Sequence, residues 1–338
     1  MTIFESFPPL KTSEQLTWQI SKKEIAQVLP VLTPNTAVRE MEINGVPVED
    51  TFAEAFSMHM NRTIITAYDQ EWAYTTALEA TGFGTSVIMA PAEAGIEYLL
   101  GPDETPDGRP GVRVIFAVGS KKKLEPQLLA RLGQCVLTSP TASAFDDTPN
   151  PKDLYEIGKK VSLFGDGYQT KKGPIDGRVL WLIPRMSGTC VMQNMFGRVK
   201  GVAGGNIIYT CKDVKSGMES GKAAVKAIEK VEGAYTPFPG GLVGSGSKPS
   251  SRYKVLFAST NEKFCPTLRA LVPDTMVPKG SEFVQEIVIN GLTKEAVANA
   301  TKVAIEEVCK HPGITKMTAG NYGGKLGEHQ IHLHELFK

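Results

Sequence analysis

The sequence predicts an α+β fold made of two ferredoxin-like (split βαβ) lobes. The chain of 338 residues is long enough for about two domains. Between residues 62 and 135, short apolar runs and segments with helical spacing follow the order strand, helix, strand, strand, helix, which is the ferredoxin-like order. A similar alternation begins again near residue 161. We therefore expect one lobe in each half of the chain.

The first predicted lobe covers residues 41–150. Asp69 is a suitable N-cap for the helix that follows it, and Gly82 is a suitable stop signal. A later helix is indicated by leucines near helical spacing. The predicted elements are strands at RTIITA (62–67), GTSVIMA (84–90) and VRVIFAVG (112–119), and helices over DQEWAYTTALEATG (69–82) and around residues 124–135.

The second predicted lobe covers residues 151–338 and follows the proline-containing segment 148–153. Its strand-like segments are VSLFGDG (161–167), RVLWLIP (178–184), NIIYTCK (206–212), YKVLF (253–257), FVQEIVING (283–291) and ITKMTAG (314–320), and its helices are predicted over residues 216–232 and 294–310. Residues 1–40 stand apart as an N-terminal extension of unknown role, because prolines bracket one weakly amphipathic segment at residues 18–29.

Composition and charge exclude several classes of protein. Hydrophobic residues make up 41% and charged residues 22%, and no run approaches the roughly 18 apolar residues of a membrane helix. A net charge of +1 with scattered Lys and Arg argues against a nucleic-acid partner. The five cysteines contain no CxxC pair, so neither a disulfide framework nor a zinc site is indicated. Since the first residues also lack a signal-peptide pattern, we expect a cytoplasmic protein.

Glu286 is the strongest candidate for a catalytic residue. Side chains alternate faces along a strand, so Glu286 shares a face with Val288 and Asn290 and has apolar neighbours on both sides. Desolvation raises the pKa of a carboxyl group, which brings a general acid or base nearer to working pH. The pattern also allows a strand-edge glutamate that faces water.

Two glycine-rich loops are candidates for ligand contact. In GGLVGSGSK (240–248), Ser247 stands where the lysine of a nucleotide-binding loop would follow the glycine, and Lys248 comes one residue late. A nucleotide triphosphatase is therefore not favoured, although Lys248 and backbone amides could hold phosphate or carboxylate groups, and a plain turn fits equally well. AGNYGGKLG (319–327), which carries Lys325, lacks the strand-to-helix setting of a dinucleotide motif and is interpreted as a loop that approaches a ligand or another subunit.

Other reactive residues leave alternatives open. Glu93 and Arg109 lie in PAEAG and DGRPG, where they could form a structural ion pair or orient a ligand in a shared cleft. The stretch from Ala80 to Gly95 is interpreted as a buried strand that delivers Glu93 into a turn. Cys265 has no histidine close in sequence, so a buried structural thiol is the favoured interpretation over a nucleophile.

A metal site at the C-terminus is not favoured. His332 and His334 would share one face of a strand, but His329 would lie on the other. No carboxylate or cysteine cluster in the sequence completes such a site.

Many segments of the chain resemble formylmethanofuran:tetrahydromethanopterin formyltransferases. The similarity runs in order from about Met41 to the C-terminus without large gaps. The similar segments are ATGFGTSVIMAPAEAG (80–95), GPDETPDGRPG (101–111), GQCVLTSPTASAFD (133–146), LFGDGYQ (163–169), GVAGGN (201–206), VEGAYTPFPGG (231–241), ASTNEKFCPT (258–267), EIVINGL (286–292) and AGNYGGKLG (319–327).

The resemblance implies acyl transfer of a formyl group between methanofuran and N5 of tetrahydromethanopterin, through a tetrahedral intermediate. It implies that Glu286 carries the proton transfers. Asn261 and backbone amides of the loops are candidate donors to the oxyanion. Several family members carry cysteine where this chain has Ala90, so direct transfer is favoured over a covalent thiol route. No metal or tightly bound cofactor is implied, and methanofuran and tetrahydromethanopterin (or its dephospho form) would be cosubstrates.

The resemblance also implies partners. Ferredoxin-like lobes often leave a sheet face or edge to be covered, so a homo-oligomer, either dimer or tetramer, is expected. In a bacterial formaldehyde-oxidation setting, hydrolase subunits of a formyltransferase/hydrolase complex are expected partners. The basic segment 185–200 departs from the acidic methanogen members. Two alternatives remain: a non-catalytic scaffold subunit of such a complex, and a pterin-binding protein without turnover.

Overall fold

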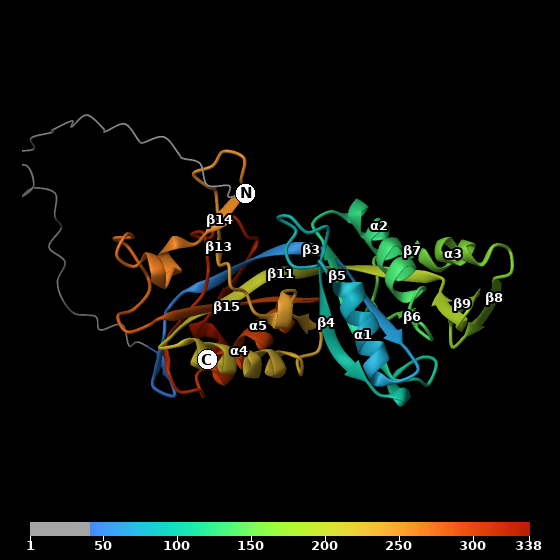
Figure 1. Ribbon diagram of the computed structural model, residues 1–338, viewed down its shortest axis with the longest axis horizontal. Helices are drawn as coiled ribbons and strands as arrows, with labels where there is room; N and C mark the ends of the chain where they lie inside the picture. Colours follow the sequence, from blue (N-terminus) through green and yellow to red (C-terminus); the bar gives the residue numbers. More distant parts are fainter. Residues whose placement is uncertain (1–40) are drawn as a thin grey trace, which may run out of the picture. The chain divides into compact units, whose positions relative to one another are not determined.

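Two long antiparallel strands, β3 (Phe52–Thr66) and β11 (Met195–Cys211), run side by side through the middle of the fold (Figure 1). Met60 of β3 pairs with Val199 of β11, and the ladder continues to Phe56 and Ala203. The computed structural model describes residues 41–338. The predicted extension 1–40, with its segment 18–29, lies outside the described residues.

Most strands of residues 41–338 join one mixed sheet around β3 and β11. β15 (Phe283–Gly291) and β16 (Ile314–Thr318) flank β11, while β5 (Gly111–Val118) pairs with β3. The remaining strands of this sheet are β1 (Met41–Ile43), β2 (Val46–Val48), β4 (Glu93–Leu100), β6 (Ser143–Asp146), β7 (Asp153–Glu156), β8 (Thr170–Ile175), β9 (Arg178–Arg185), β10 (Gly188–Gln193), β12 (Ala234–Tyr235) and β17 (His329–His332). β13 (Ser247–Pro249) and β14 (Ala258–Thr260) form a separate two-stranded sheet.

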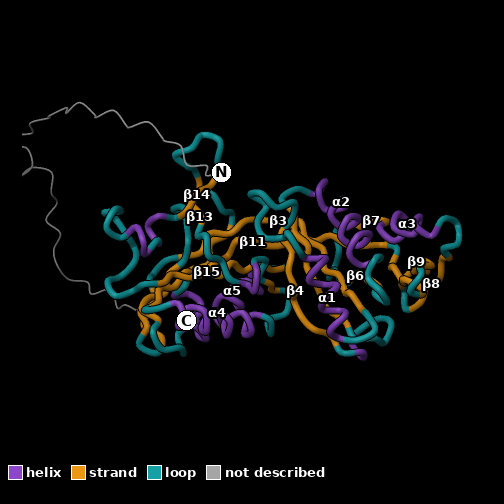
Figure 2. The backbone as a smooth tube through the Cα atoms, viewed as in Figure 1, coloured by secondary structure: helices purple, strands orange, loops and turns teal. Residues whose placement is uncertain are grey.

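The helices form two groups that are well separated along the sheet (Figure 2). α1 (Gln70–Thr81) packs on β4 and β5, as α2 (Lys121–Arg131) does on β5, and the short α3 (Ile157–Ser162) lies near α2. α4 (Val214–Ile228) and α5 (Lys294–Val308) pack on one another and on β11 and β15. Side-chain caps fix three helix starts, because Asp69, Asp213 and Thr293 each accept a backbone N–H from the first turn.

Each helix group covers its own apolar core. One core draws on residues 65–196 and centres on α1, α2 and β5. The other draws on residues 46–55 and 202–333 and centres on α4, α5, β11 and β15. The second core holds β15 rigidly, which matters because β15 carries Glu286.

The α+β class predicted from the sequence is confirmed, as are most of the predicted elements. The strands at 62–67, 112–119, 178–184, 206–212, 283–291 and 314–320 all lie in or overlap observed strands, and the helices near 69–82, 124–135, 216–232 and 294–310 are present. None of the helices in the described part of the chain combines the length and apolar character needed to cross a membrane.

Three predicted strands are wrong. Residues 84–90 form turns in which Val87, Ile88 and Met89 are exposed, and the strand begins only at Glu93. Residues 161–167 end α3 and continue into a 3-10 turn. Residues 253–257 form a turn before β14. In each case an apolar run faces solvent or ends a helix, and composition alone does not separate these situations from a buried strand.

Candidate active site

Glu286 lies in the middle of β15, on the face that the alternation predicts. Gln285, Ile287 and Ile289 are buried toward the core, whereas Glu286 is half-buried. Its backbone is held on both sides, because it pairs with Ile208 of β11 and accepts the Val243 N–H at 2.9 Å through its carbonyl oxygen. A rigid strand therefore presents this carboxyl group at a fixed position.

The electrostatic environment of Glu286 favours the protonated form. Burial raises the pKa of its carboxyl group to about 7, while a hydrogen bond from Asn206 opposes that rise. The Asn206 Nδ2 atom donates to Glu286 Oε1 at 3.0 Å. A carboxyl group with this pKa can both take up and release a proton near neutral pH.

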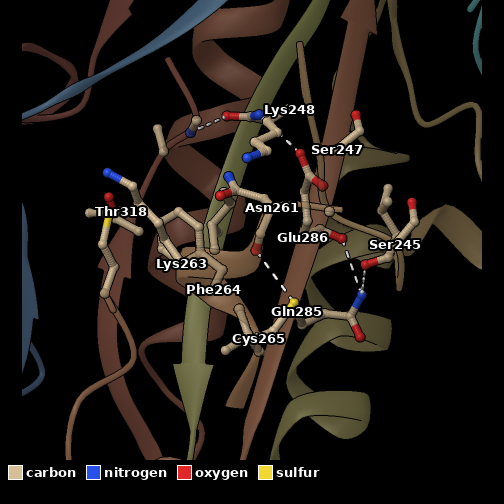
Figure 3. Close-up of a pocket in the computed structure, with 18 of the residues that line it drawn as sticks. Ser245, Ser247, Lys248, Asn261, Lys263, Phe264, Cys265, Gln285, Glu286 and Thr318 are labelled. Atoms are coloured by element: carbon tan, nitrogen blue, oxygen red, sulfur yellow. Dashed lines mark hydrogen bonds between the residues drawn. The ribbon is translucent and has the colours of Figure 1, made fainter. Parts of the chain in front are cut away.

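Two cavities of about 440 Å³ and about 970 Å³ open onto Glu286. Figure 3 shows side chains from several segments gathered around it. The smaller cavity is also lined by Asn261, Lys263 and Cys265. The larger one is lined by Glu93 and by the exposed turn of Val87 to Met89. Both cavities share Asn206, residues 243–248, Glu286 and Tyr322.

The small sheet of β13 and β14 forms part of the wall of the two cavities. Asn261 donates its backbone N–H to the Gly246 carbonyl at 2.6 Å, which ties the two strands together. The predicted ligand-contact residues Ser247 and Lys248 line both cavities. However, Lys248 Nζ is already 2.5 Å from Glu262 Oε1, so its charge is partly neutralised.

Glu93 lines the larger cavity and contacts Asn290 of β15. Its carboxylate accepts Asn290 Nδ2 at 2.7 Å and the Val87 N–H at 3.1 Å. Burial raises its pKa, and these two bonds oppose the rise. Asn290 is fully buried and accepts the Gly204 N–H at 2.8 Å, so it ties Glu93 to β11.

Arg109 is not brought to this site. It pairs with Asp107 at 2.7 Å and donates to the Thr141 carbonyl at 2.7 Å, outside both cavities. The expected pairing with Glu93 is therefore wrong, and so is the expectation of a shared cleft. Arg109 instead pairs within its own loop, because Asp107 is only two residues away from it. Two motifs that are close in sequence therefore need not contact one another. Lys325 is exposed and lies next to the lining residue Leu326 without lining either cavity.

Cys265 lines the smaller cavity without a base beside it. Its thiol lies 3.4 Å from the Asn261 carbonyl oxygen and 3.5 Å from Thr260 Oγ1. Among residues 41–338, no histidine lines either cavity.

The three C-terminal histidines contact different partners: His329 lies 3.0 Å from Ser57 Oγ, the His332 ring packs at a tilt against Phe52, and His334 contacts the Val48 carbonyl. β17 ends at His332, so His334 does not share its strand. Over the described range of the chain, no three potential ligands gather in metal-binding positions.

Sequence reasoning missed Asn206 and Tyr322, which contact or approach Glu286 from elements far away in the chain. Asn206 ends the GVAGGN segment and Tyr322 lies in AGNYGGKLG, so both belong to motifs that the resemblance marked. No periodicity singles them out, because the contacts depend on how β11, β15 and the loop after β16 meet.

The comparisons with known proteins point to one family. Residues 41–185 match the family described as formylmethanofuran-tetrahydromethanopterin formyltransferase, and residues 188–336 match the family described as its proximal lobe. Curated proteins named formylmethanofuran–tetrahydromethanopterin formyltransferase are similar to this chain. The one from Archaeoglobus fulgidus is 53% identical and the one from Methanopyrus kandleri is 52% identical, each over 88% of this chain and 100% of the relative.

Solved structures show the same similarity. The formyltransferase from Methanosarcina barkeri superposes with a TM-score of 0.86 at 47% identity, over 88% of this chain and 100% of that chain. A chain of the formyltransferase/hydrolase complex from Methylorubrum extorquens, solved with methylofuran, superposes with a TM-score of 0.84 at 40% identity, over 88% of this chain and 99% of that chain. The family resemblance expected from the motifs is confirmed: the chain belongs to the formylmethanofuran–tetrahydromethanopterin formyltransferase family.

Proposed function

We propose that this chain transfers a formyl group between methanofuran and N5 of tetrahydromethanopterin, with Glu286 as the acid and base. Relatives about half identical over their whole length carry the name of this activity. The observation that carries the proposal is the setting of Glu286: a carboxyl group with a pKa of about 7 at the meeting point of two cavities. Two cavities suit a reaction that must bring two coenzymes together.

The reaction needs one proton to move twice. When N5 of the pterin attacks the formyl carbon, a new C–N bond forms and ionised Glu286 takes the proton from N5. When the C–N bond to methanofuran breaks, the same group returns that proton to the departing amine. A group with a pKa near working pH is efficient in both directions, which suits a transfer between two amines.

The tetrahedral intermediate needs donors for its oxyanion. Asn261 and the backbone amides of residues 244–247 line the cavities and are our candidates for that task. We propose that Ser247 and Lys248 contact the coenzymes at the same wall. Glu93 would contact a coenzyme in the larger cavity, Asn290 would hold the Glu93 carboxylate in place, and Lys325 would contact a coenzyme only at the cavity edge. We do not extend the proposal to Arg109.

We propose that the fold consists of two ferredoxin-like lobes. The two apolar cores and the two consecutive family matches support this organisation. The sequence predicted a division at residue 150. Because Ile157, Ile183 and Phe196 pack into the core of α1 and α2, while Val202 packs into the other core, we favour a division within β11.

We propose that methanofuran and tetrahydromethanopterin, or its dephospho form, act as exchangeable cosubstrates and that no cofactor is tightly bound. The solved relative in a formyltransferase/hydrolase complex supports hydrolase subunits as partners of this chain. A homo-oligomer is also proposed, because β8 lies at an open edge of the sheet and could be covered by a second subunit.

The test follows the ultraviolet change when purified full-length protein meets formyl-methanofuran and tetrahydromethanopterin, with a variant that starts at Met41 beside it. We expect formyl-tetrahydromethanopterin to form at equal rates in both, since the site lies within residues 41–338. Coenzyme binding without turnover by well-folded protein would contradict the proposal and favour a pterin-binding protein. Absence of both binding and turnover would favour a scaffold subunit.

A further inference from the structure

Glu54 is a second buried carboxylate beside the site, and its partners are all backbone amides. It lies on β3 and is 2% exposed. Its carboxylate accepts the N–H groups of Tyr322 at 2.7 Å, Gly324 at 3.0 Å, Leu326 at 2.5 Å and Gly327 at 2.6 Å. Burial alone would raise the pKa of Glu54, but the four backbone bonds lower it overall, so the group is charged at neutral pH.

The segment that Glu54 holds is the loop of residues 320–327. Gly323 and Gly324 adopt φ values of +73° and +70°, so the loop folds back and points several amides at one place. This loop has few other anchors: Asn321 donates to Thr51 and Phe52, and Glu54 donates its own N–H to the Gly320 carbonyl at 3.3 Å. Without the Glu54 carboxylate, four amides near the cavity would lose their acceptor.

The loop connects Glu54 to Glu286 through one side-chain amide. The Gly320 N–H donates to Asn206 Oδ1 at 2.8 Å, while Asn206 Nδ2 donates to Glu286 Oε1 at 3.0 Å. An amide side chain has one accepting end and one donating end. Because Gly320 occupies the accepting end, Asn206 must turn its donating end toward Glu286. The same loop presents Tyr322 to both cavities.

We propose that Glu54 is a positioning residue for formyl transfer: it anchors the loop 320–327, which fixes the Asn206 amide and Tyr322 against Glu286. This inference rests on the proposed function. Releasing the loop would allow the Asn206 amide to rotate and present its oxygen to Glu286. Glu286 would then lose its only side-chain donor among the described residues and hold its proton more tightly.

The other ionisable groups that line the two cavities do not take over this role. Three of them are already in ion pairs, Lys248 with Glu262, Lys263 with Asp274, and Glu49 with Lys316. The ionisable groups that face Glu286 across the cavities are Glu49, Glu54, Glu93, Lys248, Lys263, Cys265 and Tyr322. A change at Glu54 should therefore reach Glu286 mainly through the loop and Asn206.

The test compares wild type with Glu54→Gln and with Glu328→Gln. Glu328 is an exposed carboxylate at the end of the same segment, where it accepts a bond from Ser57, so it is a matched control. In Glu54→Gln we expect kcat to fall about tenfold or more, because small displacements in a site are costly. We also expect the apparent pKa of the pH–rate profile to rise by about one unit. Glu328→Gln should match wild type in both.

Two further measurements separate this effect from general damage. Hydrogen exchange read by mass spectrometry should show residues 320–327 protected in wild type and in Glu328→Gln but fast in Glu54→Gln, with α4 and α5 unchanged. In the Asn206→Ala background, Glu54→Gln should no longer move the apparent pKa, because the Asn206 amide that connects the loop to Glu286 is already absent. If Glu54→Gln does not fold, Glu54→Asp, which keeps the charge but reaches fewer amides, replaces it.

The inference is overturned if loop exchange is equally fast in wild type and variant, or if kcat falls with no movement of the pH profile. Failure of the proposed function would look different. Wild type would then transfer no formyl group, while the exchange protection, which does not depend on activity, would still report on the anchoring of the loop.

Discussion

Glu286 is half-buried and Glu54 is buried, both line the larger cavity, and their surroundings shift their pKa values in opposite directions. Glu286 receives one side-chain hydrogen bond, and burial raises its pKa to about 7. Glu54 receives four backbone N–H bonds, and its pKa is lowered.

At Glu54 the four backbone bonds together outweigh the effect of burial, whereas at Glu286 burial outweighs the one bond from Asn206. A carboxylate surrounded by amides is stabilised as an anion and can serve as a fixed anchor. A carboxyl group with one donor can have a pKa close to neutral pH, so it can both release and take up a proton. Different elements create the two environments. Glu286 projects from β15 as a side chain with one donor, whereas the backbone amides of the loop 320–327 surround the Glu54 carboxylate on β3.

The largest effect is expected from removing the proton carrier itself. Glu286→Gln should lower the rate of formyl transfer at least about 100-fold, since general acid–base catalysis contributes on this scale. Coenzyme affinity, measured by titration, should change little because the amide keeps the shape of the side chain. Glu282→Gln is the matched control, as Glu282 is an exposed carboxylate on the approach to the same strand. Normal turnover in Glu286→Gln would sink the assignment.

Asn206→Ala sharpens the comparison by taking away the single donor of Glu286. We expect the apparent pKa of the pH–rate profile to rise further above 7, because the ionised carboxylate loses its stabilising bond. At pH 7 the rate in the direction that starts with proton uptake from N5 should fall several-fold, and it should recover as the pH rises. A profile identical to that of wild type would show that Asn206 does not set the proton affinity.

The change in unfolding free energy with pH should have opposite signs in Glu286→Gln and Glu54→Gln. The folded-state pKa of Glu286 lies above its unfolded value of 4.5, so wild type loses stability as pH rises from about 4.5 to about 7. Glu286→Gln escapes this loss and should be more stable than wild type above pH 7.

Glu54 should behave in the reverse way. Its folded-state pKa lies below 4.5, so it adds stability above that pH and loses it as the pH falls. Glu54→Gln should therefore be less stable than wild type at pH 7, with a gap that closes in acid. Denaturant unfolding at several pH values measures both trends, and parallel curves for the two variants would break the comparison.

The smallest effect is expected at Cys265. Its thiol lines the smaller cavity but has no histidine beside it within residues 41–338. Direct transfer requires no nucleophilic side chain, so Cys265→Ser should change the rate by less than about threefold. A loss comparable to that of Glu286→Gln, or capture of a formyl-thioester by mass spectrometry, would favour a covalent route instead.

The local parts of the fold were predictable from sequence, and the contacts between distant segments were not. Alternation placed Glu286 on the correct face of β15, because a strand packed on α4 and α5 has one obligatory apolar face. The apolar composition of Val87 to Met89 predicts a strand, but these side chains line a cavity instead of the core.

Glu54 and Asn206 were not found from sequence for a related reason. Glu54 meets its amide partners across about 270 positions of the chain, and Asn206 meets Glu286 across 80. Such contacts depend on the order of strands β3, β11, β15 and β16 in the sheet. The glycines of the loop 320–327 marked an unusual backbone, but nothing in the sequence pointed to the carboxylate that it surrounds.

Direct titration of the glutamate carboxyl groups tests the central claim most closely. With 13C-labelled glutamate, the carboxyl resonance that is lost in Glu286→Gln should titrate in wild type with a midpoint near pH 7. The resonance lost in Glu54→Gln should remain that of an anion down to below pH 4.5. A Glu286 resonance that titrates near 4.5 would contradict the account, because the fold would then supply no proton carrier matched to neutral pH.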